Sequence, residues 1–407
     1  MESSKTYFRT GLGLKRAVLP VLESEYHSRV VDWLQEHDYR LSAGGLTIRL
    51  AEEFGYCYGV DRAVQYAYEA RHKFPDRRLF LVGEIIHNPH VNNRLREMEI
   101  ECLMPGENGR FDFGGIEPED VVIIPAFGVT TMDFQALRDK GCLLVDTTCG
   151  SVLNVWKRVE GYARDGYAAI IHGKAFHEES KATASQATQF GGGAYLIIKD
   201  TEDAQIVCSY IVNGGDRDDF LERFGHACSD GFDPATDLVK VGVANQTTML
   251  ASETVKIAEQ FRRAMVERYG AENLDAHYRH FDTLCSATQD RQDAVIKMME
   301  SPPDLMIVIG GYNSSNTNHL AQICARHTRT YHLEDSTCID PEKGTISHKR
   351  VGTDELATER DWLPAGDIEI GLTAGASTPN NKIGDAVERL FAARGVVLEE
   401  ILADPVA

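Results

Sequence analysis

The chain has 407 residues, enough for roughly two or three domains, and 43% of them are hydrophobic, so we expect a packed core. With 62 acidic and 42 basic side chains it carries a net charge of −20, which argues against a nucleic-acid-binding surface and against a polybasic membrane patch. No apolar run is long enough for a signal peptide or a transmembrane span, so we expect a cytoplasmic protein whose nine cysteines form no disulfide framework.

Residues 1–45 are predicted to form an N-terminal extension. Within it, apolar residues recur at helical spacing at Val21, Leu22, Val30, Val31 and Leu34. The extension contains no residue that we expect to be catalytic.

Alternating strands and helices follow. The expected strands are short apolar runs at 46–51, 78–86, 120–127, 142–146, 167–173, 194–200, 238–244, 304–311, 329–334 and 368–375. Several of these runs are continuously apolar, which is typical of strands covered on both faces in parallel α/β sheets. Amphipathic helices separate the strands, for example at 248–269. The sequence therefore predicts an α/β fold.

Three cysteines share one local setting. Cys57, Cys149 and Cys285 each stand where a strand gives way to a helix. Apolar residues follow Cys57 and Cys149 at the same four offsets, whereas only Val295 fits this pattern after Cys285. The pattern indicates a weak three-fold repeat of α/β units, each offering one thiol at a helix N-terminus.

Such thiols suit a metal–sulfur cluster, because the free N–H groups of a helix N-terminus stabilise thiolates. Three ligands to a four-iron cluster would leave one iron open, as a Lewis-acid catalyst requires. The wide spacing of the three cysteines matches no compact zinc or ferredoxin motif, so three unrelated loop cysteines remain an alternative. Cys142 and Cys324 are expected to pack in the core.

Small polar residues and histidines recur after the other expected strands. They are His87, His177, Glu179, Thr247, Ser314, Ser315, Asn316 and Ser377. Each could be a simple helix cap or turn residue. Their repetition at the strand ends, where α/β folds bind ligands, favours a phosphate held by neutral donors and histidines. No phosphate-loop or dinucleotide-binding motif accompanies them, so we expect no nucleotide cofactor.

Eight motifs carry a resemblance to a known family. In chain order they are GYCYGVDRAV, GEIIHNPHV, DTTCGSV, HEE, NQTT, LCSATQDRQ, NSSNTNHL and TAGASTP, and they span roughly residues 46–393. In this order they resemble the 4-hydroxy-3-methylbut-2-enyl diphosphate reductases, the last enzymes of the methylerythritol phosphate route to isoprenoids. The N-terminal extension and the stretch 335–367 resemble the longer cyanobacterial and plant-type members.

The resemblance implies three pseudo-symmetric α/β domains arranged as a trefoil around a central iron–sulfur cluster. We place the domains at 46–148, 149–284 and 285–393, between the extension 1–45 and a C-terminal tail 394–407. The implied cofactor is one [4Fe-4S] cluster with three cysteine ligands and an open iron site. The implied reaction is a two-electron reductive dehydroxylation that yields isopentenyl and dimethylallyl diphosphates.

The resemblance also assigns roles to residues. Cys57, Cys149 and Cys285 match the metal ligands, and Glu179 matches the residue that relays the proton. The positions that match the substrate-binding residues are His87, His177, Thr247, Ser314, Ser315, Asn316 and Ser377. One position departs from the short bacterial pattern, since Phe127 stands where those enzymes carry a histidine that contacts the diphosphate.

The expected partners are the allylic diphosphate substrate and an electron donor such as ferredoxin or flavodoxin, with no nucleic acid and no membrane. Two alternatives stay open at this point. A cluster-dependent hydro-lyase would need an arginine or lysine clamp for carboxylates, which the motifs lack. A non-enzymatic zinc- or iron-binding regulator would contain metal but no sulfide.

Overall fold

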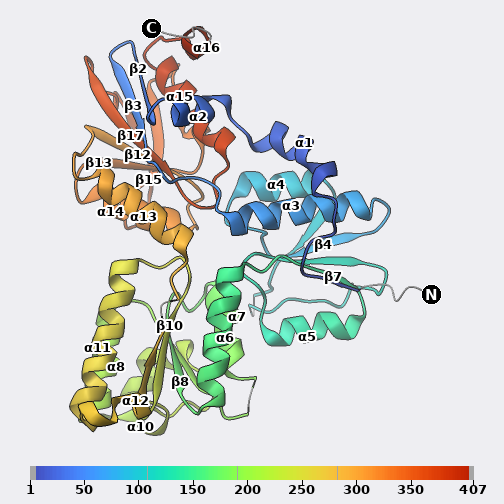
Figure 1. The fold of residues 1–407 in the computed structure, drawn as a ribbon, viewed down its shortest axis with the longest axis vertical. Coiled ribbons are helices and arrows are strands. Elements are labelled where there is room, and N and C mark those ends of the chain that lie inside the picture. The colour runs from blue at the N-terminus through green and yellow to red at the C-terminus, as the bar shows by residue number, and fades with distance from the viewer. Residues whose placement is uncertain (1–5, 108, 190, 282, 403–407) are drawn as a thin grey trace. The chain divides into compact units, whose positions relative to one another are not determined.

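The computed structural model describes residues 6–107, 109–189, 191–281 and 283–402 (Figure 1). The chain forms two compact units. The first unit comprises Met1–Leu12, Lys73–Ile85 and Leu95–Cys285, and the second comprises Gly13–His72, Ile86–Arg94 and Ser286–Ala407. Both units are α/β bodies built on parallel strands, as the sequence predicts.

The first unit holds two sheets in its described part, and both are entirely parallel. In one, the strand order is β1 (Tyr7–Phe8), β7 (Leu143–Asp146), β6 (Val121–Ile124), β4 (Leu79–Val82) and β5 (Ile100–Leu103). In the other, it is β11 (Tyr278–His280), β10 (Val241–Asn245), β8 (Ala168–His172) and β9 (Tyr195–Ile198). Every residue of β4, β6, β7, β8 and β10 is buried, which explains their continuous apolar runs.

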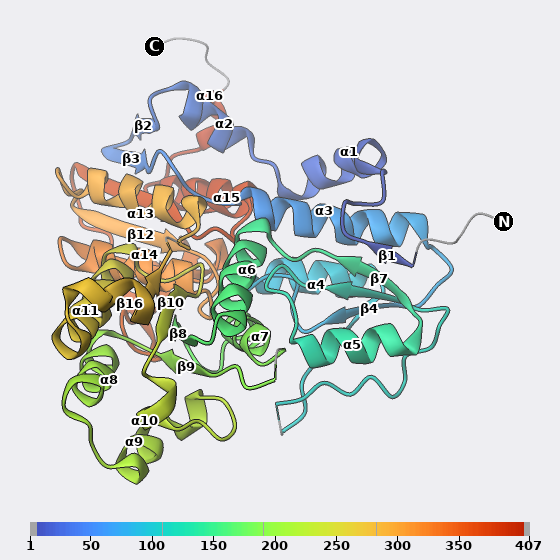
Figure 2. The same ribbon diagram turned by 60° about the horizontal axis from the view of Figure 1, so that its bottom comes forward.

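Helices cover these sheets. They are α5 (Thr131–Lys140), α6 (Gly150–Arg164), α7 (Glu178–Ala187), α8 (Thr201–Asn213), α9 (Arg217–Phe224), α10 (Pro234–Asp237), α11 (Ala251–Tyr269) and α12 (Leu274–His277), with short 3-10 turns at Gly225–Ala227 and Ala271–Asn273. Figure 2 shows α5 along the five-stranded sheet, where Leu137 packs with Val122 and Leu144. This helix begins at the cap Thr130 and ends at Gly141, whose φ of 73° suits glycine.

The second unit is built on one mixed sheet of eight strands. Its strand order is β14 (Ile339–Asp340), β15 (Thr345–Lys349), β13 (Arg329–Leu333), β12 (Leu305–Ile309), β17 (Ile368–Ala374), β3 (Leu46–Leu50) and β2 (Arg40–Ala43), and β16 (Leu356–Arg360) pairs with β15. The central strands β13, β12, β17 and β3 are parallel to one another, and the outer strands are antiparallel.

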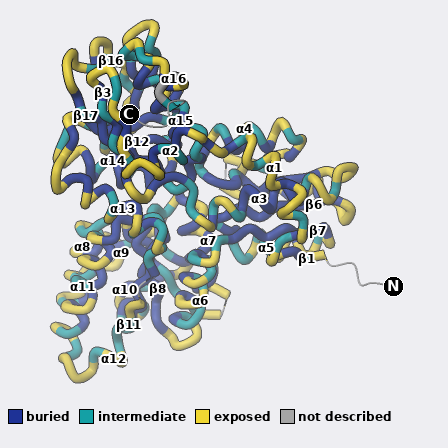
Figure 3. The backbone as a smooth tube through the Cα atoms, turned by 45° about the horizontal axis from the view of Figure 1, so that its top comes forward, coloured by how far each residue is buried: buried dark blue, intermediate teal, exposed yellow. Residues whose placement is uncertain are grey.

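The helices of the second unit are α1 (Lys15–Tyr26), α2 (Arg29–Glu36), α3 (Tyr58–Lys73), α13 (Ser286–Met298), α14 (Ser315–Ala325), α15 (Asn380–Ala392) and α16 (Leu398–Leu402), with a 3-10 turn at Ser336–Cys338. Helix α4 (Pro89–Glu97) begins in this unit, and its last residues belong to the first unit. The core joins Ile307 and Leu372 of the sheet to Leu390 of α15. Figure 3 shows β12, which is buried along its whole length, in dark blue.

All ten expected strands are present, although most are shorter than their apolar runs. The apolar spacing in the extension is also confirmed, but as two helices, because Ser28 caps a new helix by accepting a hydrogen bond from the Val31 nitrogen. The extension adds an edge strand to two sheets, β1 beside β7 and β2 beside β3.

Strand pairing departs from the predicted domain ranges at one place. β3 opens the range 46–148, yet it pairs with β17 and β2 in the sheet of the second unit. Hydrogen bonding between distant segments decides this pairing, and the order of elements along the chain does not reveal it. The three domain ranges remain a prediction.

Candidate functional site

Every predicted site residue lies just beyond the carboxyl end of a parallel strand. The pairs of strand and following residue are β3 with Cys57, β4 with His87, β7 with Cys149, β8 with His177 and Glu179, β10 with Thr247, β11 with Cys285, β12 with Ser314, Ser315 and Asn316, and β17 with Ser377. Ligands bind at this edge in α/β sheets, so these positions are compatible with the predicted roles, which remain predictions.

Two of the three cysteines are neighbours in the first unit. Cys149 is the N-cap residue of α6, and its backbone nitrogen donates to the Ala126 carbonyl at 3.0 Å. The hydroxyl of Ser151, the second residue of α6, donates to the Cys285 sulfur at 3.4 Å. Burial raises the pKa of the Cys149 thiol, and the neighbouring Cys285 thiol acts in the same direction. A bound cation would reverse this effect, because it stabilises both thiolates.

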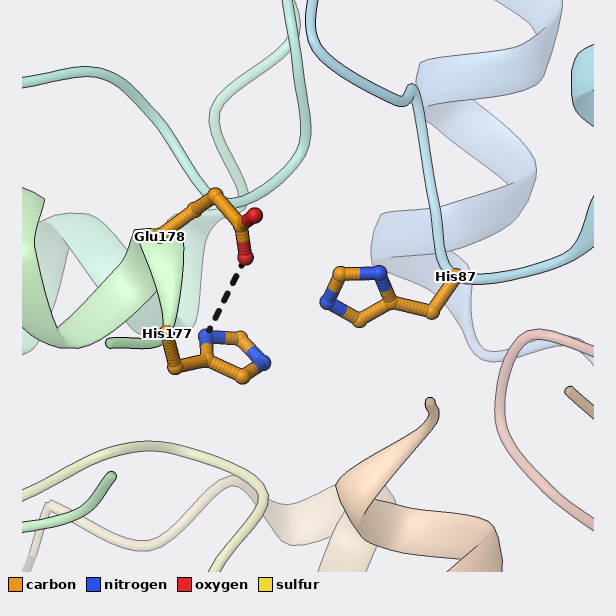
Figure 4. Close-up of side chains that lie close together, drawn as sticks. All are labelled: His87, His177 and Glu178. Carbon is orange, nitrogen blue, oxygen red and sulfur yellow. Dashed lines mark ion pairs between the residues drawn. The ribbon is translucent and has the colours of Figure 1, made fainter. Parts of the chain in front are cut away.

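A second group in the first unit surrounds Glu179. This carboxylate is 1% exposed, and it accepts hydrogen bonds from the Thr247 backbone nitrogen at 2.5 Å and from the Thr247 hydroxyl at 3.0 Å. His177 caps α7 by accepting at Nδ1 from the Glu179 nitrogen at 3.1 Å. The same Nδ1 lies 3.9 Å from the Glu178 carboxylate, as the dashed line in Figure 4 marks.

Backbone and amide contacts connect the Glu179 group to the segment before Cys285. Asn245, at the end of β10, accepts from the Thr283 hydroxyl through its side-chain oxygen. The amide of Asn245 donates to the Gln246 carbonyl at 3.0 Å, directly before Thr247. In the first unit, the segment after β10 is therefore hydrogen-bonded both to Glu179, the predicted proton donor, and to the segment that leads to the predicted ligand Cys285.

The remaining predicted residues come together in the second unit around the segment after β17. The Cys57 nitrogen donates to the Ala376 carbonyl at 3.2 Å, and the Ala376 nitrogen donates to Oδ1 of Asn316 at 3.0 Å. The Ser377 hydroxyl donates to the His87 carbonyl at 3.2 Å. Cys57, His87, Asn316 and Ser377 are thus fixed against one short segment of backbone.

Helix α14 offers buried polar atoms that nothing in the described residues satisfies. Ser315 Oγ, Asn316 Nδ2 and Thr317 Oγ1 lie in its first turn, are buried and have no hydrogen-bond partner there. A buried donor without a partner costs about 1–3 kcal/mol, so such a group indicates a bound acceptor. Together with the N–H groups of the helix start, these side chains fit an anion such as a phosphate.

Some of the polar residues that follow the strands cap helices. Asn88 Oδ1 accepts from the Val91 nitrogen at 3.2 Å with Pro89 first in α4, and Ser314 caps α14. Thr247 does not open a helix, because α11 begins only at Ala251. The Phe127 ring, in the histidine position of short bacterial relatives, meets the His177 ring edge-on with centroids 5.7 Å apart.

The apolar repeat pattern failed to identify the buried polar residues that follow Cys285. Thr288, Arg291 and Gln292 interrupt its apolar pattern, yet they are between 2% and 4% exposed. A buried polar position reads as a surface position in a sequence, so the pattern could not identify them. Thr317 was missed for a similar reason, because a threonine inside a helix carries no signal of its own.

Core packing is confirmed for two other cysteines. Cys142 is 3% exposed and Cys324 is fully buried. Burial raises the pKa of Cys142 to about 11 and that of Cys324 to about 12. Both thiols therefore stay protonated at neutral pH, unlike a metal ligand. Among the described helices, none combines the length and apolar character that crossing a bilayer requires.

Known proteins match nearly the whole chain. The LytB protein family profile covers residues 48–391. A "4-hydroxy-3-methylbut-2-enyl diphosphate reductase" from Synechococcus sp. is 49% identical over 392 residues, which is 96% of each chain. The protein of the same name from Gloeobacter violaceus is 48% identical over 397 residues, covering 97% of this chain and 94% of its own.

One solved structure supports the fold. The "E-1-hydroxy-2-methyl-but-2-enyl-4-diphosphate reductase from Plasmodium falciparum" is similar with a TM-score of 0.61 at 21% identity, over 84% of this chain and 87% of the other. The resemblance of the eight motifs is therefore confirmed, including its cyanobacterial character. The chain belongs to the LytB family of 4-hydroxy-3-methylbut-2-enyl diphosphate reductases.

Proposed function

We propose that this chain reduces (E)-4-hydroxy-3-methylbut-2-enyl diphosphate to isopentenyl and dimethylallyl diphosphates on one [4Fe-4S] cluster with three cysteine ligands. The observation that carries the proposal is the near full-length similarity to reductases of this name, with each motif residue at the carboxyl end of a strand. Two electrons and two protons convert the allylic alcohol into an alkene and water, so the reaction needs a proton donor, an electron source and a diphosphate site.

Cys57, Cys149 and Cys285 are the proposed ligands. The hydrogen bond from Ser151 to Cys285, the effect of Cys285 on the Cys149 pKa and the 3.5 Å approach of the Val60 nitrogen to the Cys57 sulfur support this role. N–H and O–H donors to sulfur stabilise thiolate ligands of iron–sulfur clusters. The cluster, when bound, supplies single electrons and an open Lewis-acidic iron.

The diphosphate site is proposed at His87, His177, Thr247, Ser314, Ser315, Asn316 and Ser377. The Ser315 hydroxyl and the Asn316 side-chain nitrogen have no hydrogen-bond partner among the described residues, and they support this assignment because a diphosphate supplies acceptors. Binding the diphosphate away from the reacting carbon fixes the substrate's orientation, which lowers the entropic part of the barrier. Neutral donors suit a protein whose net charge is −20.

Glu179 is the proposed proton donor. Both of its oxygens face Thr247, so the threonine hydroxyl can pass a proton between the carboxyl group and the substrate oxygen. The electrons are proposed to come from ferredoxin or flavodoxin, and the nine free cysteines support a reducing, cytoplasmic setting.

Anaerobic purification with iron and sulfide counts, followed by an assay with reduced viologen and the diphosphate alcohol, tests the proposal. We expect about four irons and four sulfides per chain, as the proposed cluster requires, and turnover that depends on the reductant. Cys149→Ala should lose most iron and sulfide, whereas the core variant Cys142→Ala should keep both. Metal without sulfide, or a dehydration that needs no reductant, would overturn the proposal.

A further inference from the structure

Arg291 lies in the second turn of α13 and is 4% exposed. Its guanidinium reaches back to the loop before Cys57. Nε donates to the Gly55 carbonyl at 3.0 Å, and Nη2 donates to the carbonyls of Phe54, Gly55 and Tyr56 at 3.2, 2.7 and 3.0 Å. One side chain therefore binds the carbonyl groups of three consecutive residues, and these residues directly precede Cys57.

The same guanidinium is anchored to its own helix, because Nη1 donates to the Ala287 carbonyl at 2.8 Å. Helix α13 begins at Ser286, directly after Cys285. Arg291 thus links the start of the helix that follows one proposed ligand to the loop that ends in another. On its other side the Cys57 loop is held by the bonds from the Gly55 and Cys57 nitrogens to the carbonyls of Ala374 and Ala376, both at 3.2 Å.

The charge of Arg291 has no anionic partner in the residues that the structure describes. All five of its hydrogen bonds end on neutral carbonyl groups, and it takes part in no ion pair there. A buried cation is costly unless an anion lies nearby. Three thiolates and the sulfides of a cluster would supply that anionic charge next to Tyr56 and Cys57.

We propose that Arg291 is a positioning residue that fixes the Cys57 loop for cluster binding and whose charge raises the reduction potential of the cluster. This inference rests on the proposed role of Cys57 as a ligand. The fork of the guanidinium reaches several carbonyls at once, which the single nitrogen of lysine cannot do. The positive charge favours the reduced, more negative cluster over the oxidised one.

Two substitutions distinguish the positioning of the Cys57 loop from the effect of the Arg291 charge on the cluster. Arg291→Lys keeps the positive charge but lacks the planar guanidinium group that reaches several carbonyls. Arg291→Gln lacks both the charge and the guanidinium group. We expect both variants, anaerobically purified, to release iron to a chelator on the order of 10–100-fold faster than the parent, as for other residues that orient metal ligands. We expect Arg291→Gln to have a more negative midpoint potential and Arg291→Lys to keep the parent's potential.

Arg389→Lys is the matched control, because Arg389 also lies in a helix of the second unit and donates to a backbone carbonyl, that of Ile339, at 2.9 Å. It should release iron at the parent's rate. Should Arg291→Gln not fold, Arg291→Lys carries the test of positioning through the rate of iron release. Parent-like release and potential in the Arg291 variants would refute the inference.

Cys57→Ala tests the proposed ligand role of Cys57 separately from the role of Arg291. If Cys57→Ala loses the cluster while the Arg291 variants behave like the parent, only the role of Arg291 is wrong. If Cys57→Ala keeps the parent's cluster spectrum and iron content, the proposed ligand set is wrong, and the inference about Arg291 is overturned with it.

Discussion

Thr247 donates two hydrogen bonds to the carboxylate of Glu179, one from its backbone nitrogen and one from its hydroxyl. Glu179 lies in the first turn of α7, which follows β8, and Thr247 lies in the loop after the neighbouring parallel strand β10, so the sheet fixes their approach. The bond from the backbone nitrogen holds the carboxyl group in place, while the hydroxyl bond can exchange a proton. Substitutions at Glu179 and at Thr247 are therefore expected to differ in their effect on activity.

Glu179→Gln should bind substrate and keep the cluster but lose activity by about 10²–10⁴-fold, the usual contribution of a general acid. The glutamine oxygen can still accept from the Thr247 nitrogen, so the loops stay in place. Thr247→Val keeps that nitrogen and removes only the hydroxyl, so its loss of kcat should be smaller. Single-turnover assays with reduced enzyme measure both effects.

Glu69→Gln is the control for Glu179, because Glu69 is also 1% exposed and accepts from Gln65 Nε2 at 2.6 Å. It should keep parent-like turnover. A Glu179→Gln variant that turns over as fast as Glu69→Gln would remove Glu179 from the proton path.

The N-terminal extension is expected to stabilise the Cys149 loop through Tyr7. The Tyr7 hydroxyl donates to Asp146 Oδ2 at 2.5 Å, and Asp146 Oδ1 accepts from the nitrogen and hydroxyl of Thr148 at 3.0 and 2.6 Å. Tyr7→Phe leaves a buried carboxylate oxygen with one donor fewer, which should lower the free energy of unfolding by about 1–3 kcal/mol. It should also speed the loss of the cluster.

Denaturant unfolding of the apoprotein and iron release measure these two effects. Tyr269→Phe is the control, because the Tyr269 hydroxyl is buried without a hydrogen-bond partner in the described residues, so its removal should leave stability unchanged or higher. Equal stabilities of the two variants would contradict the anchoring role of Tyr7.

The 335–367 stretch is expected to support the diphosphate site through Lys349. This lysine is 7% exposed, and its Nζ donates to the Tyr312 carbonyl at 3.2 Å, two residues before the cap Ser314. Lys349→Met removes this charged donor, so the Km for the substrate should rise by up to about tenfold, corresponding to roughly 1.4 kcal/mol. The kcat should change little.

Steady-state kinetics with a fixed excess of reductant measure the split between Km and kcat. Lys343→Met is the control within the same stretch, since Lys343 is exposed and its ion pair with Asp340 lies at the surface. A Lys349→Met variant with the Km of Lys343→Met would show that this stretch does not act on the site.

Acid is expected to destabilise the second unit through His332. This residue is 1% exposed and its Nε2 contacts the Gly310 carbonyl at 3.0 Å. Its pKa is lowered to about 4, chiefly by burial, with Lys349 and His348 acting in the same direction. Above about pH 6.5, the ordinary histidine pKa, the residue is neutral in both states and its contribution is complete. As the pH falls toward 4, only the unfolded state binds the proton, so stability falls by at most about 1.4 kcal/mol per pH unit.

Urea unfolding at pH 7 and pH 5 measures this slope. His332→Gln keeps an amide donor for the Gly310 carbonyl but cannot titrate, so its stability should fall less between the two pH values. The same slope in parent and variant would assign the acid sensitivity to other groups.

The class of fold and the position of each motif in it follow from the amino-acid sequence alone. Continuous apolar runs such as 304–311 and 167–173 are strands because both of their faces are buried, and that requirement is visible in composition alone. Cys57, Cys149 and Cys285 each directly precede a helix, as the local pattern predicts. Eight ordered motifs were sufficient to identify the family.

Which segments meet, in contrast, is seen only once the chain is folded. β3 pairs with β17, more than three hundred residues away along the chain, and no local pattern reveals that partner. The hydrogen bonds of Ser151 with Cys285 and of Arg291 with the loop before Cys57 arise in the same way. Local patterns report backbone preference and burial, whereas contacts between distant loops depend on how the sheets and helices bring their ends together.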